Sequence, residues 1–274
     1  MRIDSHQHFW KFDPIRDAWI DASMEKIARD FLPEDLKPLI DQSKIDGCVA
    51  VQADQSETET EFLLDFAGRY DFVKGVVGWV DLRSPQLSER LEHYCNNSFF
   101  KGVRHIVQAE KDGFMLQESF LKGIQQLKDF NLTFDILIFP HQLEEAVALV
   151  KKNPEQAFVL DHIAKPYIKD KKIDQWAKHI NQLAVHQNVY CKLSGLLTEA
   201  DWNHWQEEDF TAYLTVIMKA FGADRLMYGS DWPVCLLAGS YPHVVRIVEN
   251  FISSLSTDDQ KKIMGQNAHH FYNL

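Results

Sequence analysis

The sequence predicts a (β/α)8 barrel, and three observations support this fold class. Eight short, largely apolar β-rich runs recur along the 274 residues, and helical patterns separate them. Strands this apolar suit a parallel sheet that is covered on both faces. Eight strand–helix units over about 250 residues are typical of this barrel. A doubly wound open sheet is the structural alternative.

The predicted strands follow in chain order, and each ends a largely apolar run. They are residues 2–6, 47–53, 74–80, 101–107, 133–139, 157–163, 189–195 and 225–231. Between them, apolar residues recur at spacings of three and four in residues 60–70, 86–94 and 142–152, which predicts amphipathic helices. No Pro/Gly-rich linker or low-complexity stretch interrupts the pattern. We therefore expect one domain, residues 1–274.

One long connection breaks the regular alternation of strand and helix. It spans about residues 9–44 and carries Trp10, Phe12 and Trp19 before a helix predicted over residues 33–43. Long loops at the mouth of a barrel commonly form one wall of a pocket. We expect these aromatic residues to lie beside a binding site or in the core.

Composition excludes several classes of partner. The formal net charge of −11 and a pI near 5.5 give no general attraction to nucleic acid or to an anionic membrane. No secretory signal opens the chain, and no run reaches the roughly 18 apolar residues of a membrane span. The cysteines form no CxxC pair, which favours buried thiols in a reducing cytoplasm. They are Cys48, Cys95, Cys191 and Cys235.

The first strand ends in an HxH motif. In extended backbone, residues i and i+2 point to the same face, so His6 and His8 are expected to project together. The site of such a barrel lies at the carboxyl ends of its strands. His162 follows the sixth predicted strand and Asp231 ends the eighth, so the four side chains are expected to meet.

These residue types support two kinds of chemistry. Three imidazoles and a carboxylate suit Zn²⁺ or another borderline cation, with a position left open for water. Without a metal, Asp231 would act as a general base towards water while cationic groups polarise a carbonyl. The residues alone leave this choice open. They also leave open that Asp231 caps the following helix.

Motifs along almost the whole chain resemble the amidohydrolase superfamily, and within it the sugar lactonases that include L-fuconolactonases and L-rhamnonolactonases. They include RIDSHQHFW, FLPEDLKPLI, GWVDLRSP, KGVRHIVQ, VLDHIAKP, CKLSGL, YGSDWPV and NAHHFYNL. The resemblance implies a core of His6, His8, His162 and Asp231, with Asp231 activating the hydrolytic water. It also implies substrate contacts, namely Arg104, His141, Lys165, Gln52 and Trp19.

One departure from the superfamily bears on metal content. Binuclear amidohydrolases usually carry a carboxylated lysine or a glutamate at the end of strand four or five, whereas the fourth strand here reads KGVRH. A two-metal site is therefore not expected. The resemblance implies at most one divalent cation, with zinc as the best match, held weakly or not required for activity.

The predicted function is the hydrolysis of a sugar aldonolactone, such as L-fucono-1,5-lactone, to its aldonic acid. The alternatives are hydrolysis of a dicarboxylate or other cyclic ester and metal-dependent decarboxylation. A dicarboxylate would require several arginines at the mouth, where only Arg104 is clearly placed. His141 could belong to a helix entry, and Arg104 or Lys165 to surface ion pairs. The expected partner is a small sugar lactone, and the oligomeric state, including a homo-oligomer, stays open.

Overall fold

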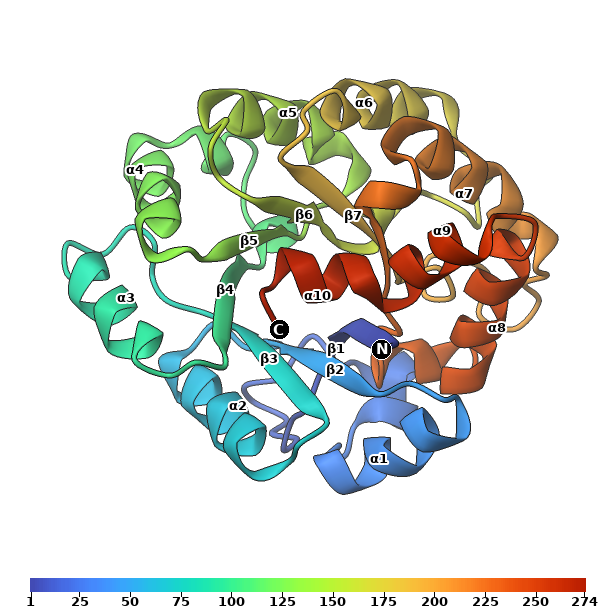
Figure 1. The fold of residues 1–274 in the computed structure, drawn as a ribbon, viewed down its shortest axis with the longest axis horizontal. Helices are drawn as coiled ribbons and strands as arrows, with labels where there is room; N and C mark the ends of the chain where they lie inside the picture. The colour runs from blue at the N-terminus through green and yellow to red at the C-terminus, as the bar shows by residue number, and fades with distance from the viewer.

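Eight parallel strands, hydrogen-bonded in chain order, form a barrel in the computed structural model, which describes residues 1–274 (Figure 1). The strands are β1 (Ile3–Gln7), β2 (Gly47–Val51), β3 (Val73–Gly78), β4 (Phe100–His105), β5 (Thr133–Ile136), β6 (Phe158–Leu160), β7 (Val189–Leu193) and β8 (Leu226–Tyr228). All seven neighbouring pairs are parallel. The predicted (β/α)8 fold is confirmed.

The barrel closes between its first and last strands just beyond their carboxyl ends. A parallel bridge joins Gln7 to Trp232. The His8 amide donates to the Trp232 carbonyl at 2.7 Å, and the Asp231 amide donates to the His6 carbonyl at 2.8 Å. The seam of the barrel therefore runs directly between the HxH motif and Asp231.

Helices form the outer layer, and the four predicted ones are found within three residues of their expected ends. They are α1 (Pro33–Gln42), α2 (Glu57–Arg69), α3 (Leu87–Cys95), α4 (Glu118–Leu127), α5 (Leu143–Lys152), α6 (Asp174–Ala184), α7 (Glu208–Phe221), α8 (Tyr241–Ile252), α9 (Thr257–Lys261) and α10 (Asn267–Phe271). Local sequence explains several starts. Ser56 and Ser240 accept backbone N–H bonds at the N-termini of α2 and α8, and Pro33 begins α1.

Small branched side chains fill the barrel interior. This buried cluster comprises Ile3, Val49, Val51, Val77, Val159, Met227, Ala268 and Tyr272. The last two come from the C-terminal segment, and α10 lies across the end of the barrel at which the chain begins (Figure 1). The Tyr272 hydroxyl donates to Asp135 of β5 at 2.9 Å. The C-terminus thus seals one end of the barrel and leaves the other end for a site.

The strands are shorter than predicted at their carboxyl ends. The clearest case is the sixth strand, predicted over 157–163, which ends at Leu160. Residues 162–165 then have positive φ angles of 47–60° and form a left-handed turn. Hydrophobicity alone does not separate this buried turn from a buried strand, which explains the error.

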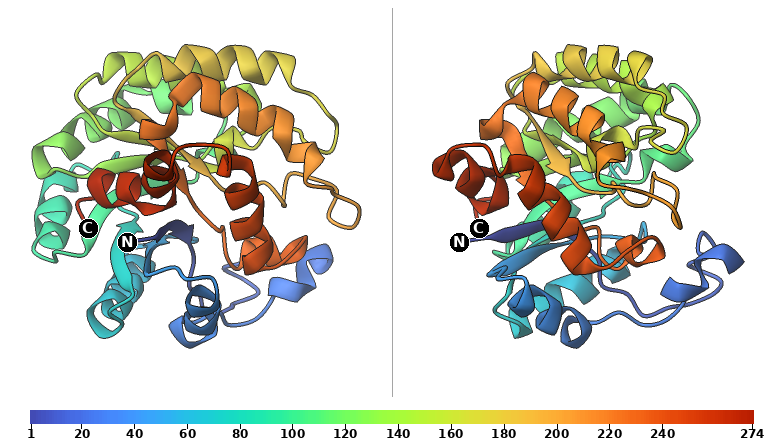
Figure 2. Two further views of the ribbon diagram at one scale, coloured as in Figure 1. Left: turned by 45° about the vertical axis from the view of Figure 1, so that its right-hand side comes forward. Right: turned by 90° about the vertical axis from the view of Figure 1, so that its right-hand side faces the viewer.

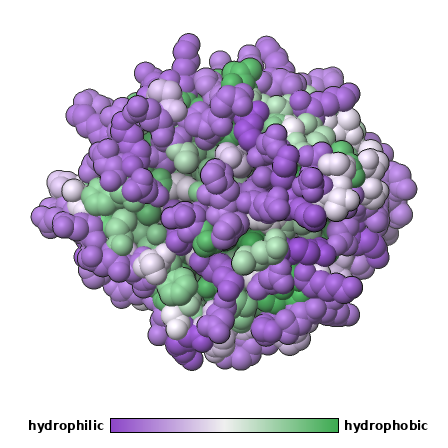
Figure 3. Space-filling model, in the orientation of Figure 1, coloured by the Kyte–Doolittle hydropathy of each residue, from purple (hydrophilic) through white to green (hydrophobic).

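The connection between β1 and α1 lies at the end of the barrel away from the termini (Figure 2). It contains a short 3-10 turn, Ala22–Ile27, and a bridge between Trp10 and Phe31. The face around the termini is mainly hydrophilic, with hydrophobic residues in separated patches (Figure 3). None of the helices combines the length and apolar character needed to cross a lipid bilayer.

Candidate active site

A cavity of about 300 Å³ opens at the carboxyl ends of the strands. Its charged and imidazole lining comes from four of them and comprises His8, Arg104, His162, Lys165 and Asp231. The rest of the lining is one amide and seven apolar side chains, namely Gln108, Trp10, Trp19, Ala53, Ile106, Ala109, Leu137 and Val234. The cavity therefore combines a reactive polar floor with apolar walls, as small-molecule sites commonly do.

The three predicted histidines meet on this floor. The Nε2 atoms of His6 and His8 are 3.2 Å apart, so the shared face expected of the HxH motif is confirmed. His8 donates from Nδ1 to the Val51 carbonyl at 2.7 Å, and Nδ1 of His162 lies 2.9 Å from the Ser194 hydroxyl. These outer contacts orient the rings, as the second shell of a metal site does.

Asp231 faces all three imidazoles. Its Oδ1 lies 3.5 Å from His8 Nε2, 3.8 Å from His162 Nε2 and 4.0 Å from His6 Nε2. Burial alone would raise the pKa of this carboxyl, but His162 and His8 outweigh that effect and hold the pKa below its ordinary value. Burial lowers the pKa of each imidazole, most strongly for His6 and His162. The floor therefore holds neutral imidazoles and an ionised carboxylate.

Backbone in the left-handed region presents two of these groups. Asp231 has φ 55°, and the turn at 162–165 is left-handed throughout. Each such residue costs roughly 1–2 kcal/mol, which surrounding structure must offset. The indole of Trp176 on α6 donates to the Ile163 carbonyl at 2.8 Å and helps to hold the turn. Strain of this kind clusters at functional sites.

Two glycines allow the backbone to approach the imidazoles closely. A Cβ on Gly195 would fall 2.6 Å from Cβ of His162, and a Cβ on Gly229 would fall 2.8 Å from Cβ of His6. Real Cβ atoms essentially never come this close to another atom. Both positions therefore require glycine if the two rings are to keep their places.

A buried charge network supports the floor from below. Arg104 donates to Asp161 at 3.1 Å and to Gln52, and Lys192 lies 3.0 Å from Asp161 and also pairs with Asp135. Lys192 and Asp161 also flank Nδ1 of His6, at 3.1 and 3.3 Å. Pairing is what makes such burial tolerable, since an isolated buried charge is very costly.

The four-residue core fits a single divalent cation. Ligands about 2.0–2.1 Å from a tetrahedral Zn²⁺ lie roughly 3.3 Å from one another, close to the 3.2–4.0 Å separations measured here. Neutral imidazoles and an ionised aspartate are the protonation states that a metal requires. One feature opposes tight binding, because Nη1 of Arg104 lies 3.3 Å from Nε2 of His6.

The predicted substrate residues are placed unequally. Arg104, Lys165 and Trp19 line the cavity, and Lys165 lies 3.8 Å from Glu199. Gln52 is buried beneath Arg104 and does not line the cavity. His141 lies outside the lining, with a side chain that is 52% exposed and 3.7 Å from Asp112. The structure therefore brings three of these five residues to the cavity.

Other site residues were not predicted from the sequence. Asp161, Lys192 and Ser194 stand at strand ends, so their position was a signal that could have been used. Gly195 and Gln108 carried no comparable signal. A glycine gives no hint of close packing, and Gln108 follows an apolar strand in a polar connection.

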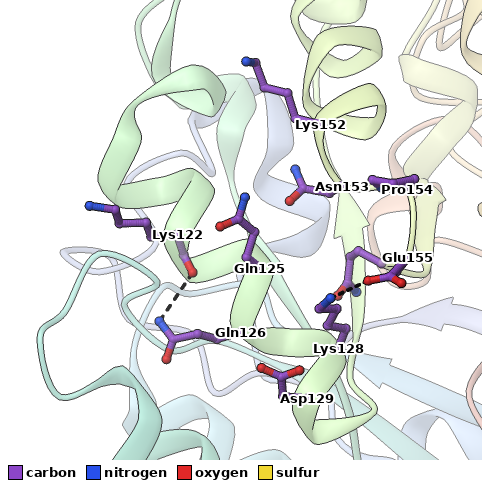
Figure 4. A pocket seen from close by; sticks show the side chains of 10 residues that line it. Lys122, Gln125, Gln126, Lys128, Asp129, Lys152, Asn153, Pro154 and Glu155 are labelled. Carbon is purple, nitrogen blue, oxygen red and sulfur yellow. Dashed lines mark hydrogen bonds and ion pairs between the residues drawn. The ribbon is translucent and has the colours of Figure 1, made fainter.

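A second cavity, of about 580 Å³, lies between α4 and the α5–β6 connection (Figure 4). Lys128 and Glu155 pair across it at 2.5 Å, and no apolar, histidine or cysteine side chain lines it. It is near the start of β5 and β6, away from the strand ends that carry the imidazoles. It offers no catalytic constellation.

Fold and site together define a (β/α)8-barrel protein with a buried histidine–aspartate centre at the carboxyl end of the barrel. The chain belongs to the amidohydrolase family, whose model matches residues 3–274, so the resemblance seen in the motifs is confirmed. It is 38% identical over 286 residues to an L-fucono-1,5-lactonase of Burkholderia multivorans, covering 100% of this chain and 96% of that one.

Two further relatives extend this comparison. An L-fucono-1,5-lactonase of Burkholderia ambifaria is 36% identical over 281 residues, covering 100% of this chain and 96% of the relative. A crystal structure of an amidohydrolase from Burkholderia multivorans with bound zinc superposes with a TM-score of 0.97 at 39% identity, covering 100% of this chain and 99% of that one.

Proposed function

We propose that this protein hydrolyses a sugar aldonolactone to its aldonic acid, with L-fucono-1,5-lactone as the preferred substrate. The observation that carries the proposal is an ionised, buried Asp231 facing neutral imidazoles on the floor of a small cavity. The two L-fucono-1,5-lactonases that match the whole chain support the same substrate class.

The proposed reaction begins with water beside Asp231. The carboxylate takes a proton as the oxygen of the water adds to the lactone carbonyl. Arg104 and the neighbouring imidazoles are placed to stabilise the developing oxyanion, since they meet Asp231 on one floor. The ring oxygen then leaves with a proton returned from Asp231. Because the lactone is an activated ester, modest electrostatic help suffices.

We propose that one divalent cation, zinc in the first instance, is held by His6, His8, His162 and Asp231. When bound, it would act as a Lewis acid towards the carbonyl oxygen. We propose that it is held weakly, because Arg104 places a positive charge 3.3 Å from Nε2 of His6. The arginine already supplies a cation to the same region.

The cavity lining favours a neutral sugar lactone over the alternatives. Arg104 and Lys165 are its only cationic side chains, and Arg104 is already paired with Asp161. A dicarboxylate would leave a charge without a partner in this small cavity. We propose Trp19 and Lys165 as substrate contacts and Gln52 as support for Arg104. His141 stays a prediction, at the exposed margin. A cytoplasmic location agrees with the four free cysteines.

Acid release from a panel of aldonolactones, followed with a pH indicator, tests this proposal. We expect rates well above spontaneous hydrolysis for L-fucono-1,5-lactone and its close stereoisomers, and little for a dicarboxylate lactone. Release no faster than the spontaneous rate with every lactone would refute the proposed function.

A further inference from the structure

One polar side chain in the cavity has no partner in the protein. The charged and imidazole groups of the lining all contact neighbours, as with His8 and Val51 or Lys165 and Glu199. The amide of Gln108 contacts none. Its Oε1 is buried without a hydrogen-bond donor, and its Nε2 bonds to no protein atom. Buried polar atoms normally have a partner, so an unpaired amide in a cavity lining indicates a missing ligand group.

The backbone that carries this amide is fixed from several directions. The Gln108 N–H donates to the Leu137 carbonyl at 3.0 Å, and Gln142 donates to the Val107 carbonyl at 3.0 Å. The Ile106 N–H donates to the Gln55 side chain at 2.7 Å. The connection after β4 is therefore tied to the connections after β2 and β5. A firmly held backbone with a free side-chain head is a preorganised recognition group.

The surroundings of the amide make it selective. Ile106, Ala109 and Leu137 line the same sector of the cavity, and none of them has a polar side-chain atom. A hydrogen bond made there meets little competition from protein groups, and an unmet one is costly. Sites of this kind discriminate strongly between a hydroxyl-bearing ligand and the analogue that lacks the hydroxyl.

We infer that Gln108 reads a ring hydroxyl of the lactone and is a specificity-determining residue of this site. A hydroxyl can donate to Oε1 or accept from Nε2, so the amide can meet it in either orientation. The inference rests on the proposed lactone hydrolysis and goes beyond it, because it assigns recognition of the sugar to a group that takes no part in the chemistry at Asp231.

The test combines enzyme variants with substrate analogues. Wild type and Gln108→Met are assayed with L-fucono-1,5-lactone and with each of its monodeoxy analogues. For wild type, kcat/KM should fall about 3- to 10-fold with one particular analogue. In Gln108→Met that analogue and the parent lactone should be hydrolysed equally well, and KM for the parent should rise while kcat changes little.

Two further variants separate recognition from damage. Gln108→Glu retains an acceptor at the same reach and should retain the discrimination. Gln117→Met, on an exposed position of the same connection, should behave as wild type. Because the Gln108 side chain makes no hydrogen bond in the protein, its variants should unfold at the wild-type temperature.

The outcomes are distinct. If wild type hydrolyses the lactone and Gln108→Met still discriminates among the analogues as wild type does, the inference is wrong and the proposed function stands. If wild type hydrolyses no lactone, the proposed function fails, and this inference fails with it.

Discussion

Replacing Gly195 by alanine tests whether close backbone packing positions His162. The new Cβ would lie 2.6 Å from Cβ and 2.8 Å from Nδ1 of His162, whereas ordinary contacts begin at about 3.4 Å. The imidazole must therefore move by roughly 0.8 Å. A misplacement of about 1 Å in a catalytic constellation can cost about 10²-fold in rate. We expect kcat on the best lactone to fall by about this factor in Gly195→Ala.

A matched variant separates this effect from backbone strain. Gly195 has φ +67° and Gly222 has φ +66°, but a Cβ on Gly222 would meet nothing within 4 Å. Both alanine variants should lose roughly 1–2 kcal/mol of unfolding free energy from the left-handed conformation. Steady-state kinetics and denaturant unfolding of both proteins provide the assay. Wild-type kcat in Gly195→Ala, or an equal loss in Gly222→Ala, would refute the reasoning.

Three other predictions concern pH and metal. Burial lowers the pKa of the three imidazoles and their presence lowers that of Asp231, so kcat/KM should stay level through pH 6.5, where an ordinary histidine titrates; a fall centred there would contradict this. Burial raises the pKa of Glu59 to about 8, so ionisation destabilises the folded state. Glu59→Gln should therefore gain melting temperature over wild type as pH rises from 4.5 through 8, and a gap independent of pH would count against it. Calorimetric titration of the chelated protein should show that His8→Ala weakens zinc binding by more than about 10²-fold, whereas His105→Ala, outside the cavity lining, leaves it unchanged.

The sequence predicted the barrel because its signals are local and repeated. Eight apolar runs alternate with helical patterns, and each run proved to contain a strand. The ends were harder to predict. In AFVLDHI the strand stops at Leu160, because His162 and Ile163 take left-handed backbone that nothing in their side chains announces. Tertiary contacts such as the Trp176 bond to Ile163 hold that turn, and they are invisible in one sequence.

The site was predicted in part for a related reason. His6, His8, His162 and Asp231 follow parallel strands, so the fold alone brings them to one end of the barrel. Longer side chains in connections do not follow this rule. His141 points to solvent from a helix entry, whereas the neighbouring connection delivers Gln108 to the cavity. Which of two such residues faces inward depends on the path of a loop.

The most direct test of the account is the kcat of Asp231→Asn on the lactone that wild type hydrolyses best. Asparagine keeps the size of the side chain but cannot take the proton from water. The account predicts a loss of at least about 10³-fold, at the upper end of what a general base contributes, in a protein that still folds. A variant that keeps activity within about tenfold of wild type would contradict the claim that Asp231 activates the water.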